Sequence, residues 1–186
     1  MFRGMAFIDG ENLVCRYQDM LKSGFTPLNR EGVVTHRQDI YVFNPRMFSY
    51  SHINILRATI YTSAVADEDK INEIKSQIQA LSYDQYGEGG KSVFPFIVKK
   101  NKDGRQSKGV DIQLTVDLLS HSFRHNIEVA FIATGDADFI PAIEEAKRNG
   151  CQVYVAAFSS GLNQKLRHAA DKFIDLDSFY FEPKSK

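Results

Sequence analysis

Short apolar runs rich in β-branched and aromatic residues recur along the chain and are separated by stretches with helical periodicity. The runs cover residues 4–9, 53–62, 93–98, 128–134, 151–158 and 172–176. Their length, and the lack of polar residues at every second position, are typical of strands that are buried on both faces. We therefore expect a sheet with packing on either side of it.

Helical spacing of apolar residues marks the intervening stretches. The positions that lie three or four residues apart are Ile71, Ile74, Ile78 and Leu81, then Leu114, Leu118 and His121, then Ile140, Ile143 and Ala146, which Asn149-Gly150 follows. Strands that alternate with helices predict parallel βαβ units with helices on both faces of the sheet. The predicted fold class is α/β, a three-layer, Rossmann-like α/β/α fold with a mainly parallel central sheet.

Residues 24–51 do not follow this alternation and are predicted to be an insertion into a single domain that spans residues 1–180. The stretch contains two prolines and several aromatic residues, and is interpreted as a β-hairpin, a lid or a dimer contact. Its aromatic residues are expected to stack on bases, to pack at a dimer interface or to form the core of a small hairpin. They are Tyr41, Phe43, Phe48 and Tyr50. Residues 181–186 are predicted to be a flexible tail.

Composition narrows the class of protein further. Of the 186 residues, 43% are hydrophobic and 25% are charged, which is ordinary for a soluble globular domain. Lys and Arg together number 23, as do Asp and Glu, so the net charge gives no general affinity for nucleic acids or membranes. No apolar run reaches the length of a membrane span, and we expect a cytoplasmic protein without a membrane partner.

The chain has two cysteines, Cys15 and Cys151, without a ligand-like pattern of Cys and His around them. The sequence therefore predicts neither a disulfide framework nor a zinc site. Both residues are interpreted as free, buried thiols.

Carboxylates follow two of the predicted strands at the point where each strand ends. Asp9 ends the first run, and Asp136 and Asp138 follow the fourth run in the sequence ATGDAD. A further acid, Asp111, lies near the start of a predicted helix, from which its side chain can reach the same edge of the sheet. Ligands of open parallel sheets gather at the carboxyl ends of the strands, so these four acids are expected to lie together. Clustered acids repel unless a cation lies among them, and the pattern therefore predicts an Mg²⁺ or Mn²⁺ site.

Each acid also has a structural interpretation. Asp9 can form an Asx-turn into the following helix, with Asn12 as a helper. Asp138 can be the N-cap of the helix that follows it, and Asp111 can be a first-turn acid that the helix dipole favours. Asp117 lies more than one turn after Asp111, on another side of a regular helix, and is interpreted as structural.

Residues 99–108 are strongly basic in a chain without net charge. Five basic residues lie there beside a single acid: Lys99, Lys100, Lys102, Arg105 and Lys108. The stretch is either a solvated connection or, because it directly precedes Asp111, a basic arm that attracts a phosphodiester backbone. Ser159 and Ser160, just past the fifth strand, are expected to bind a phosphate or to cap the helix predicted over 161–170.

Four segments together resemble the NYN domain family, especially its LabA-like branch within the wider group of PIN-like metal-dependent nucleases. They are FIDGENL at 7–13, KGVDIQLTVDLL at 108–119, ATGDADFIPAIEEAKRNGCQVYVAAF at 133–158 and LRHAADKFIDL at 166–176. The resemblance implies a PIN-like α/β/α fold and an acidic site that binds Mg²⁺ or Mn²⁺ and hydrolyses RNA. By motif position it also implies four metal-binding acids, Asp9, Asp111, Asp136 and Asp138, with Asn12 beside them as a polar site residue.

The sequence therefore favours a metal-dependent endoribonuclease that prefers single-stranded RNA. The alternative is a catalytically weak RNA-binding or regulatory module, and a homodimer or a regulatory protein partner is a further expectation. Toprim domains and haloacid-dehalogenase phosphatases also place acids at strand ends. They require a Glu-Gly pair or a second Asp where this chain has Asp9, Gly10 and Glu11, and are therefore disfavoured.

Overall fold

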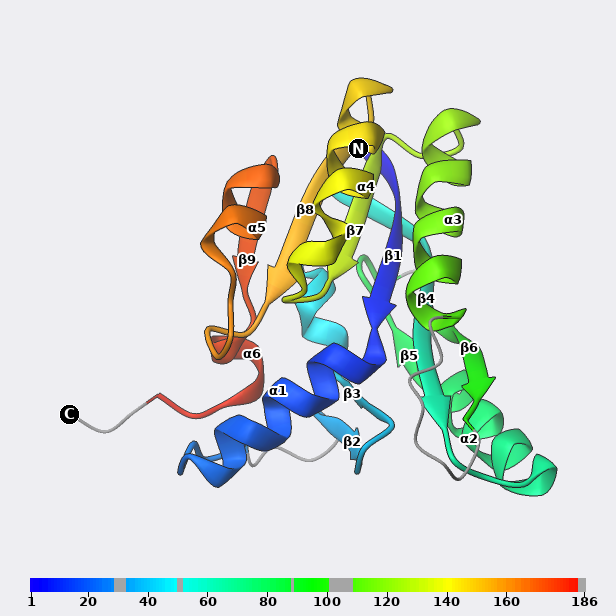
Figure 1. Cartoon of the computed structure of the whole chain (residues 1–186), viewed down its shortest axis with the longest axis vertical. Helices are drawn as coiled ribbons and strands as arrows, with labels where there is room; N and C mark the ends of the chain where they lie inside the picture. The colour runs from blue at the N-terminus through cyan, green and yellow to red at the C-terminus, as the bar shows by residue number, and fades with distance from the viewer. Residues whose placement is uncertain (29–32, 50–51, 88, 101–108, 184–186) are drawn as a thin grey trace.

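The computed structural model describes residues 1–28, 33–49, 52–87, 89–100 and 109–183, and a seven-stranded sheet runs through its centre (Figure 1). Six neighbouring strands are parallel, in the spatial order β6 (Lys91–Lys99), β4 (Ile53–Ala64), β1 (Phe2–Asp9), β7 (Val129–Ala133), β8 (Gln152–Ala157) and β9 (Lys172–Asp175). The short β5 (Ser82–Tyr83) adds an antiparallel edge beside β6. Each predicted run forms one of the parallel strands, which confirms the α/β class with a mainly parallel sheet.

Helices cover both faces of the sheet. On one face, α1 (Gly10–Lys22) and α2 (Glu68–Ala80) contribute to a first hydrophobic core. On the other face, a second core includes residues of α3 (Gly109–Phe123), α4 (Ile140–Arg148) and α5 (Gln164–Ala169). Among the described residues, no helix combines the length and the apolar character needed to cross a membrane.

The central strands are apolar on both sides because they separate these two cores. In β1, Ile8 belongs to the first core and Phe7 to the second; in β7, Phe131 and Ile132 alternate in the same way. A strand with two buried faces gains from an apolar residue at every position. This explains why the strand sequences show no alternation of polar and apolar residues.

The stretch over 24–51 contains a small hairpin. β2 (Thr35–Arg37) and β3 (Tyr41–Phe43) pair in antiparallel fashion, and the 3-10 helix η1 (Pro45–Phe48) follows. The hairpin interpretation of this stretch is therefore confirmed.

The aromatic residues of this stretch belong to the first core. Tyr41, Phe43 and Phe48 are buried, and the ring centroid of Phe48 lies 5.3 Å from that of Phe131 in β7. Base stacking or a dimer contact by these three rings is therefore wrong, because the sheet and its helices already cover them. Tyr50 lies outside the described residues.

The chain after β9 is held against the segment that follows α1. The short helix α6 (Asp177–Tyr180) leads to Phe181, which is buried and forms an isolated β-bridge with Pro27. The N–H of Glu182 donates to the carbonyl of Thr26 at 2.9 Å. A flexible tail that begins at residue 181 is therefore wrong at its start, because Phe181 is part of the core; residues 184–186 lie outside the described part of the chain.

The two cysteines lie in different surroundings. Cys151 is buried, as predicted, whereas Cys15 on α1 is exposed. A buried position for Cys15 is wrong, because α1 turns Leu13, Tyr17 and Met20 toward the core and Cys15 away from it.

The order of the strands places a topological switch point beside β1. From β1 the chain winds outward through β4 and β6, and α3 then brings it back to β7 on the other side of β1. The direction of winding thus reverses between β1 and β7. In open α/β sheets, ligands bind at the carboxyl ends of the strands at such a point. Asp9 and Asp136 lie at the carboxyl ends of these two strands.

Replacing Phe48 with alanine is expected to lower the free energy of unfolding by about 3–5 kcal/mol. The change removes a buried ring that packs against Tyr83 and Phe131. Urea denaturation followed by circular dichroism measures the loss. Phe123 at the end of α3 is exposed and provides the control, and Phe123→Ala is expected to cost less than about 1 kcal/mol. Equal losses in both variants would exclude the hairpin region from the main core.

Candidate functional site

Asp9 is the last residue of β1, and it is buried with 4% of its surface exposed. Its Oδ1 accepts the N–H of Asn12 at 3.0 Å and so caps the first turn of α1. Its Oδ2 accepts the hydroxyl of Thr134 at 2.8 Å. The predicted turn into the following helix is confirmed, and Asp9 in addition links β1 to the end of β7.

Two further hydrogen bonds fix the loop after β7 against α1. The buried Thr134 hydroxyl, which donates to Asp9, also accepts the N–H of Asp136 at 3.1 Å. The side-chain oxygen of Asn12 accepts the N–H of Gly135 at 2.8 Å. The loop that carries Asp136 therefore has a defined position relative to Asp9.

Of the two acids after β7, Asp136 caps a helix and Asp138 does not. Asp136 is the N-cap of the 3-10 helix η2 (Ala137–Phe139), where its Oδ1 accepts the N–H of Asp138 at 2.9 Å. The following helix, α4, begins without a side-chain cap. Asp138 as an N-cap is therefore wrong, because the 3-10 turn moves the capping position back to Asp136. Asp138 is exposed and lines, with Asp111 and Phe139, a small hollow of about 170 Å³.

The acids act on one another electrostatically. The pKa of Asp9 is raised to about 7, chiefly by burial and to a smaller extent by the charges of Asp111 and Glu11. Partial burial also raises the pKa of Asp111, a first-turn acid of α3 as predicted, and so do the charges of Glu11, Asp136 and Asp138. The structure thus brings the four predicted acids together at one edge of the sheet. We call Asp9, Asp111, Asp136 and Asp138 the acidic edge.

Lys100 supplies a positive charge beside the acidic edge. Its Nζ lies 2.8 Å from Oε1 of Glu11, and the hydroxyl of Ser63 donates to the same oxygen. Its charge also lowers the pKa of Asp111. Lys100, which we expected to bind RNA, is therefore engaged as a counterion of Glu11.

Three polar residues of this region were not predicted to belong to a site. They are Glu11, Ser63 and Thr134. Thr134 is a buried polar residue directly after the apolar β7, and Ser63 is a buried polar residue near the end of β4. Because burying a polar group without a partner is costly, such residues at the end of an apolar run are a signal that sequence analysis can use.

The remaining basic residues of the predicted arm are only partly described. Lys99 is exposed at the end of β6, whereas Lys102, Arg105 and Lys108 lie outside the described residues. The basic arm therefore stays a prediction.

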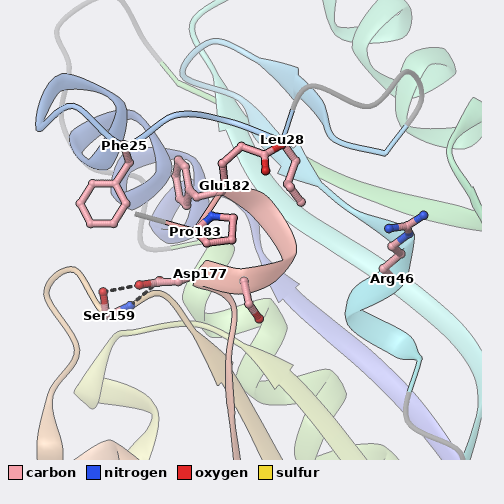
Figure 2. A pocket seen from close by; sticks show the side chains of 9 residues that line it. Phe25, Leu28, Arg46, Ser159, Asp177, Glu182 and Pro183 are labelled. Carbon is pink, nitrogen blue, oxygen red and sulfur yellow. Dashed lines mark hydrogen bonds between the residues drawn. The ribbon is translucent and has the colours of Figure 1, made fainter. Parts of the chain in front are cut away.

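Ser159 contributes to a different region of the same sheet edge. Its N–H and its hydroxyl donate to the carboxylate of Asp177 at 2.9 and 2.5 Å. Both residues line a cavity of about 690 Å³ that Phe25 and Phe181 also line (Figure 2). Capping of α5 by Ser159 or its neighbour Ser160 is wrong, because the N-cap of that helix is Asn163.

Asp117 has no part in the acidic edge. Its carboxylate accepts hydrogen bonds from the Tyr61 hydroxyl at 2.8 Å and from the Gln113 amide at 2.9 Å. It thereby ties α3 to β4, which confirms its structural interpretation.

The donors at the acidic edge suit a hard divalent cation. They are carboxylates with amide and hydroxyl oxygens beside them, and Mg²⁺ and Mn²⁺ prefer oxygen ligands. The raised pKa values of Asp9 and Asp111 reflect burial together with negative charge that a cation would stabilise. Within the described part of the chain, no three Asp, Glu, His or Cys side chains are grouped so that they could hold a metal ion. The site thus fits such an ion by chemistry and charge, and binding requires the carboxylates to draw together.

The sequence was compared with models of known protein families to find the family to which the chain belongs. The family model of the NYN domain matches residues 3–177. This chain belongs to the NYN domain family. NYN domains are generally nuclease-like and are related to the PIN-like nucleases, which usually use divalent metal ions. The predicted family is confirmed, whereas its LabA-like branch stays a prediction.

Two proteins similar to this NYN domain are described as uncharacterised or of unknown function. An uncharacterised protein of Methanocaldococcus jannaschii is 31% identical over 116 residues, which make up 59% of this chain and 48% of that protein. The chain thus spans about half the length of this relative. A crystal structure of a protein of unknown function from Vibrio parahaemolyticus matches 97% of this chain and 96% of its own, with 17% identity and a TM-score of 0.62. At such an identity the likeness concerns the fold alone.

The raised pKa of Asp9 predicts a loss of stability as the pH rises. Between the ordinary value of 3.8 and the folded value of about 7, the native state holds a proton that the unfolded state has released, so the free energy of unfolding falls with pH. The Asp9→Asn substitution keeps the shape of the side chain and removes its charge. In EDTA at about pH 8, this variant is expected to be more stable than the wild type by on the order of a few kcal/mol, and the difference is expected to vanish near about pH 4. Urea denaturation at several pH values measures it.

Asp67→Asn is the matched control for this experiment. Asp67 caps α2 as Asp9 caps α1, but it is exposed, so no such gain with pH is expected from it. A gain in both variants, or in neither, would contradict burial as the cause.

Proposed function

We propose that this NYN domain is a metal-dependent endoribonuclease that hydrolyses phosphodiester bonds of single-stranded RNA. The observation that carries the proposal is the convergence of the acidic edge around Asp9, whose pKa is raised to about 7. Lys100 pairs with Glu11, and none of the ion pairs among the described residues includes one of the four acids. Acids with raised pKa values at the carboxyl edge of an open sheet favour a functional site over a structural one.

The residues of the site divide between binding and support. The acidic edge would hold Mg²⁺ or Mn²⁺, which when bound supplies Lewis-acid stabilisation of the phosphate and a water of lowered pKa. The hydrogen bonds of Thr134 and Asn12 hold Asp9 and the loop after β7 in fixed positions relative to each other. Lys100 stabilises Glu11 beside the acids.

An RNA backbone needs positive charge near the acidic edge to approach it. Lys99 is exposed at the end of β6. Lys102, Arg105 and Lys108 follow it in the sequence and lead to Asp111. We assign the attraction of the backbone to these residues, because Lys and Arg contacts with phosphates supply most of the affinity that does not depend on sequence.

Asp136→Asn is expected to lower the rate of RNA cleavage by about a hundredfold or more, because it removes a carboxylate from the proposed metal-binding set. Labelled single-stranded RNA and the matching DNA are incubated with Mn²⁺, Mg²⁺ or EDTA, and the products are separated by gel electrophoresis. Asp117→Asn is the control, since the same change affects an acid that binds Tyr61 and Gln113 instead. It is expected to keep most of the activity.

Two results would contradict this mechanism: cleavage that persists in EDTA, or cleavage by Asp136→Asn at the wild-type rate. Intact RNA after long incubation with Mn²⁺, together with measurable RNA binding by the folded protein, would favour an RNA-binding module in place of an enzyme. Preferential cleavage of the DNA would change the substrate class.

Binding of Mn²⁺ to the acidic edge is expected to stabilise the fold whether or not RNA is cleaved. A ligand present at a hundred times its Kd raises the free energy of unfolding by about 3 kcal/mol through mass action. Urea denaturation with Mn²⁺ and with EDTA measures the gain. Asp9→Asn is expected to lose most of it and Asp67→Asn to keep it. An undiminished gain in Asp9→Asn would place the ion elsewhere.

A further inference from the structure

Arg16 lies on the side of α1 that faces the carboxyl edge of the sheet. It follows Asn12 by one helical turn, so the two side chains lie on the same side of the helix. Asn12 in turn accepts the N–H of Gly135 in the loop after β7. From the end of β1, α1 extends toward the side of the sheet that carries β8 and β9 (Figure 1). Arg16 therefore lies beyond Asn12 on the same side of α1, further from the acidic edge.

The guanidinium of Arg16 packs directly against Gly161 in the loop between β8 and α5. A Cβ atom on Gly161 would lie 2.4 Å from Cζ of Arg16, 2.6 Å from Nη1 and 2.7 Å from Nε. Gly161 also has a φ of +70°, a conformation that favours glycine. The lack of a side chain at position 161 thus leaves the space that the guanidinium fills.

Arg16 has no acid to neutralise it in the part of the chain that the structure describes. The residue is half-buried, yet the ion pairs and hydrogen bonds among the described residues do not include it. A charge that is partly removed from water is costly unless it is paired. The planar guanidinium matches the oxygens of a phosphate especially well. An external phosphate would therefore complete this arrangement.

We propose that Arg16 binds the RNA phosphate next to the one that is cleaved. The proposal rests on the proposed function and adds a second contact point for the same strand. β8, whose following loop carries Gly161, is two strands from β1, which corresponds to about 10 Å. Arg16 contacts Gly161 in the loop after β8, so it lies beside the acidic edge and not within it.

This position also accounts for one of the two serines that were predicted to bind a phosphate. Ser159 is held by Asp177. Ser160, which is half-buried, is the neighbour of Gly161 in the loop that Arg16 contacts. The proposed phosphate site therefore consists of Arg16 with Ser160 beside it.

RNA binding tests the proposal without interference from cleavage. Fluorescence anisotropy with a short labelled single-stranded RNA and Mn²⁺ is measured in the Asp136→Asn background. Adding Arg16→Gln is expected to weaken binding about fivefold to tenfold, and to reduce the slope of log affinity against log salt concentration by about 0.7, as for one lost phosphate contact on a single strand. Arg124→Gln removes the same charge from an exposed residue just past α3, at the opposite edge of the sheet, and is expected to change neither quantity.

Cleavage then locates the contact along the strand. A dinucleoside monophosphate contains only the phosphate that is cleaved, so Arg16→Gln is expected to leave its rate unchanged while it raises KM for a longer RNA. Equal losses on both substrates would overturn the proposal, since Arg16 would then act on the cleaved phosphate or on the fold. Unchanged binding and cleavage of the longer RNA would also overturn it and would leave the proposed function intact.

The two proposals fail in distinguishable ways. If the wild type cleaves no RNA, the proposed endoribonuclease activity is wrong, and the binding measurement alone decides on Arg16. A loss confined to Arg16→Gln then supports the phosphate site, whereas equal binding by the Arg16→Gln and Arg124→Gln variants overturns it. Gly161→Ala provides a second test, because its Cβ would displace the guanidinium. It is expected to weaken binding as Arg16→Gln does, and the double variant is expected to be no worse than either.

Discussion

The arrangement of this site depends on a carboxylate that is buried at the end of a strand. Asp9 accepts the N–H of Asn12 and the hydroxyl of Thr134, and so it caps α1 and reaches the neighbouring strand at the same time. Its burial costs free energy, as the pKa of about 7 indicates. The two hydrogen bonds set the direction in which α1 leaves the sheet and hold the loop after β7 beside β1. The positions of Asp136 and Asp138, which lie in this loop, therefore depend on the hydrogen bonds of Asp9.

Because helices cover both faces of the sheet, the charged residues around Asp9 come from several different elements. Glu11 lies in the first turn of α1 on the side of the first core, whereas Asp111 lies in the first turn of α3 on the side of the second. Lys100 directly follows β6 and reaches Glu11 across β4. The carboxyl edge of the sheet therefore carries charged groups from both helical layers as well as from the strand ends. This arrangement gathers charge at the end of the two hydrophobic cores, where Asp9 alone of the four acids is buried.

Sequence pattern predicted the long, buried elements and the acids that follow them. Burial on both faces leaves an unbroken apolar run, and a carboxylate at the end of such a run is visible without a structure. The hairpin strands and β5 have three residues or fewer, which is too short for a periodic pattern. The pairing of Lys100 with Glu11 joins residues 89 positions apart, and the capping by Asp136 depends on a 3-10 turn. Such features depend on tertiary contacts and local geometry that hydrophobic periodicity does not encode.

The hydrogen bonds from Thr134 to Asp9 and from Gly135 to Asn12 join residues 125 and 123 positions apart. During translation, Asp9 and Asn12 leave the ribosome long before their partners are made. Synthesis must pass β7 before that strand can pair with β1, and it must reach Asp138 before the four acids can meet. A nascent chain of this nuclease-like family that has not yet reached Asp138 therefore carries no complete acidic site while it is close to the ribosomal and messenger RNA.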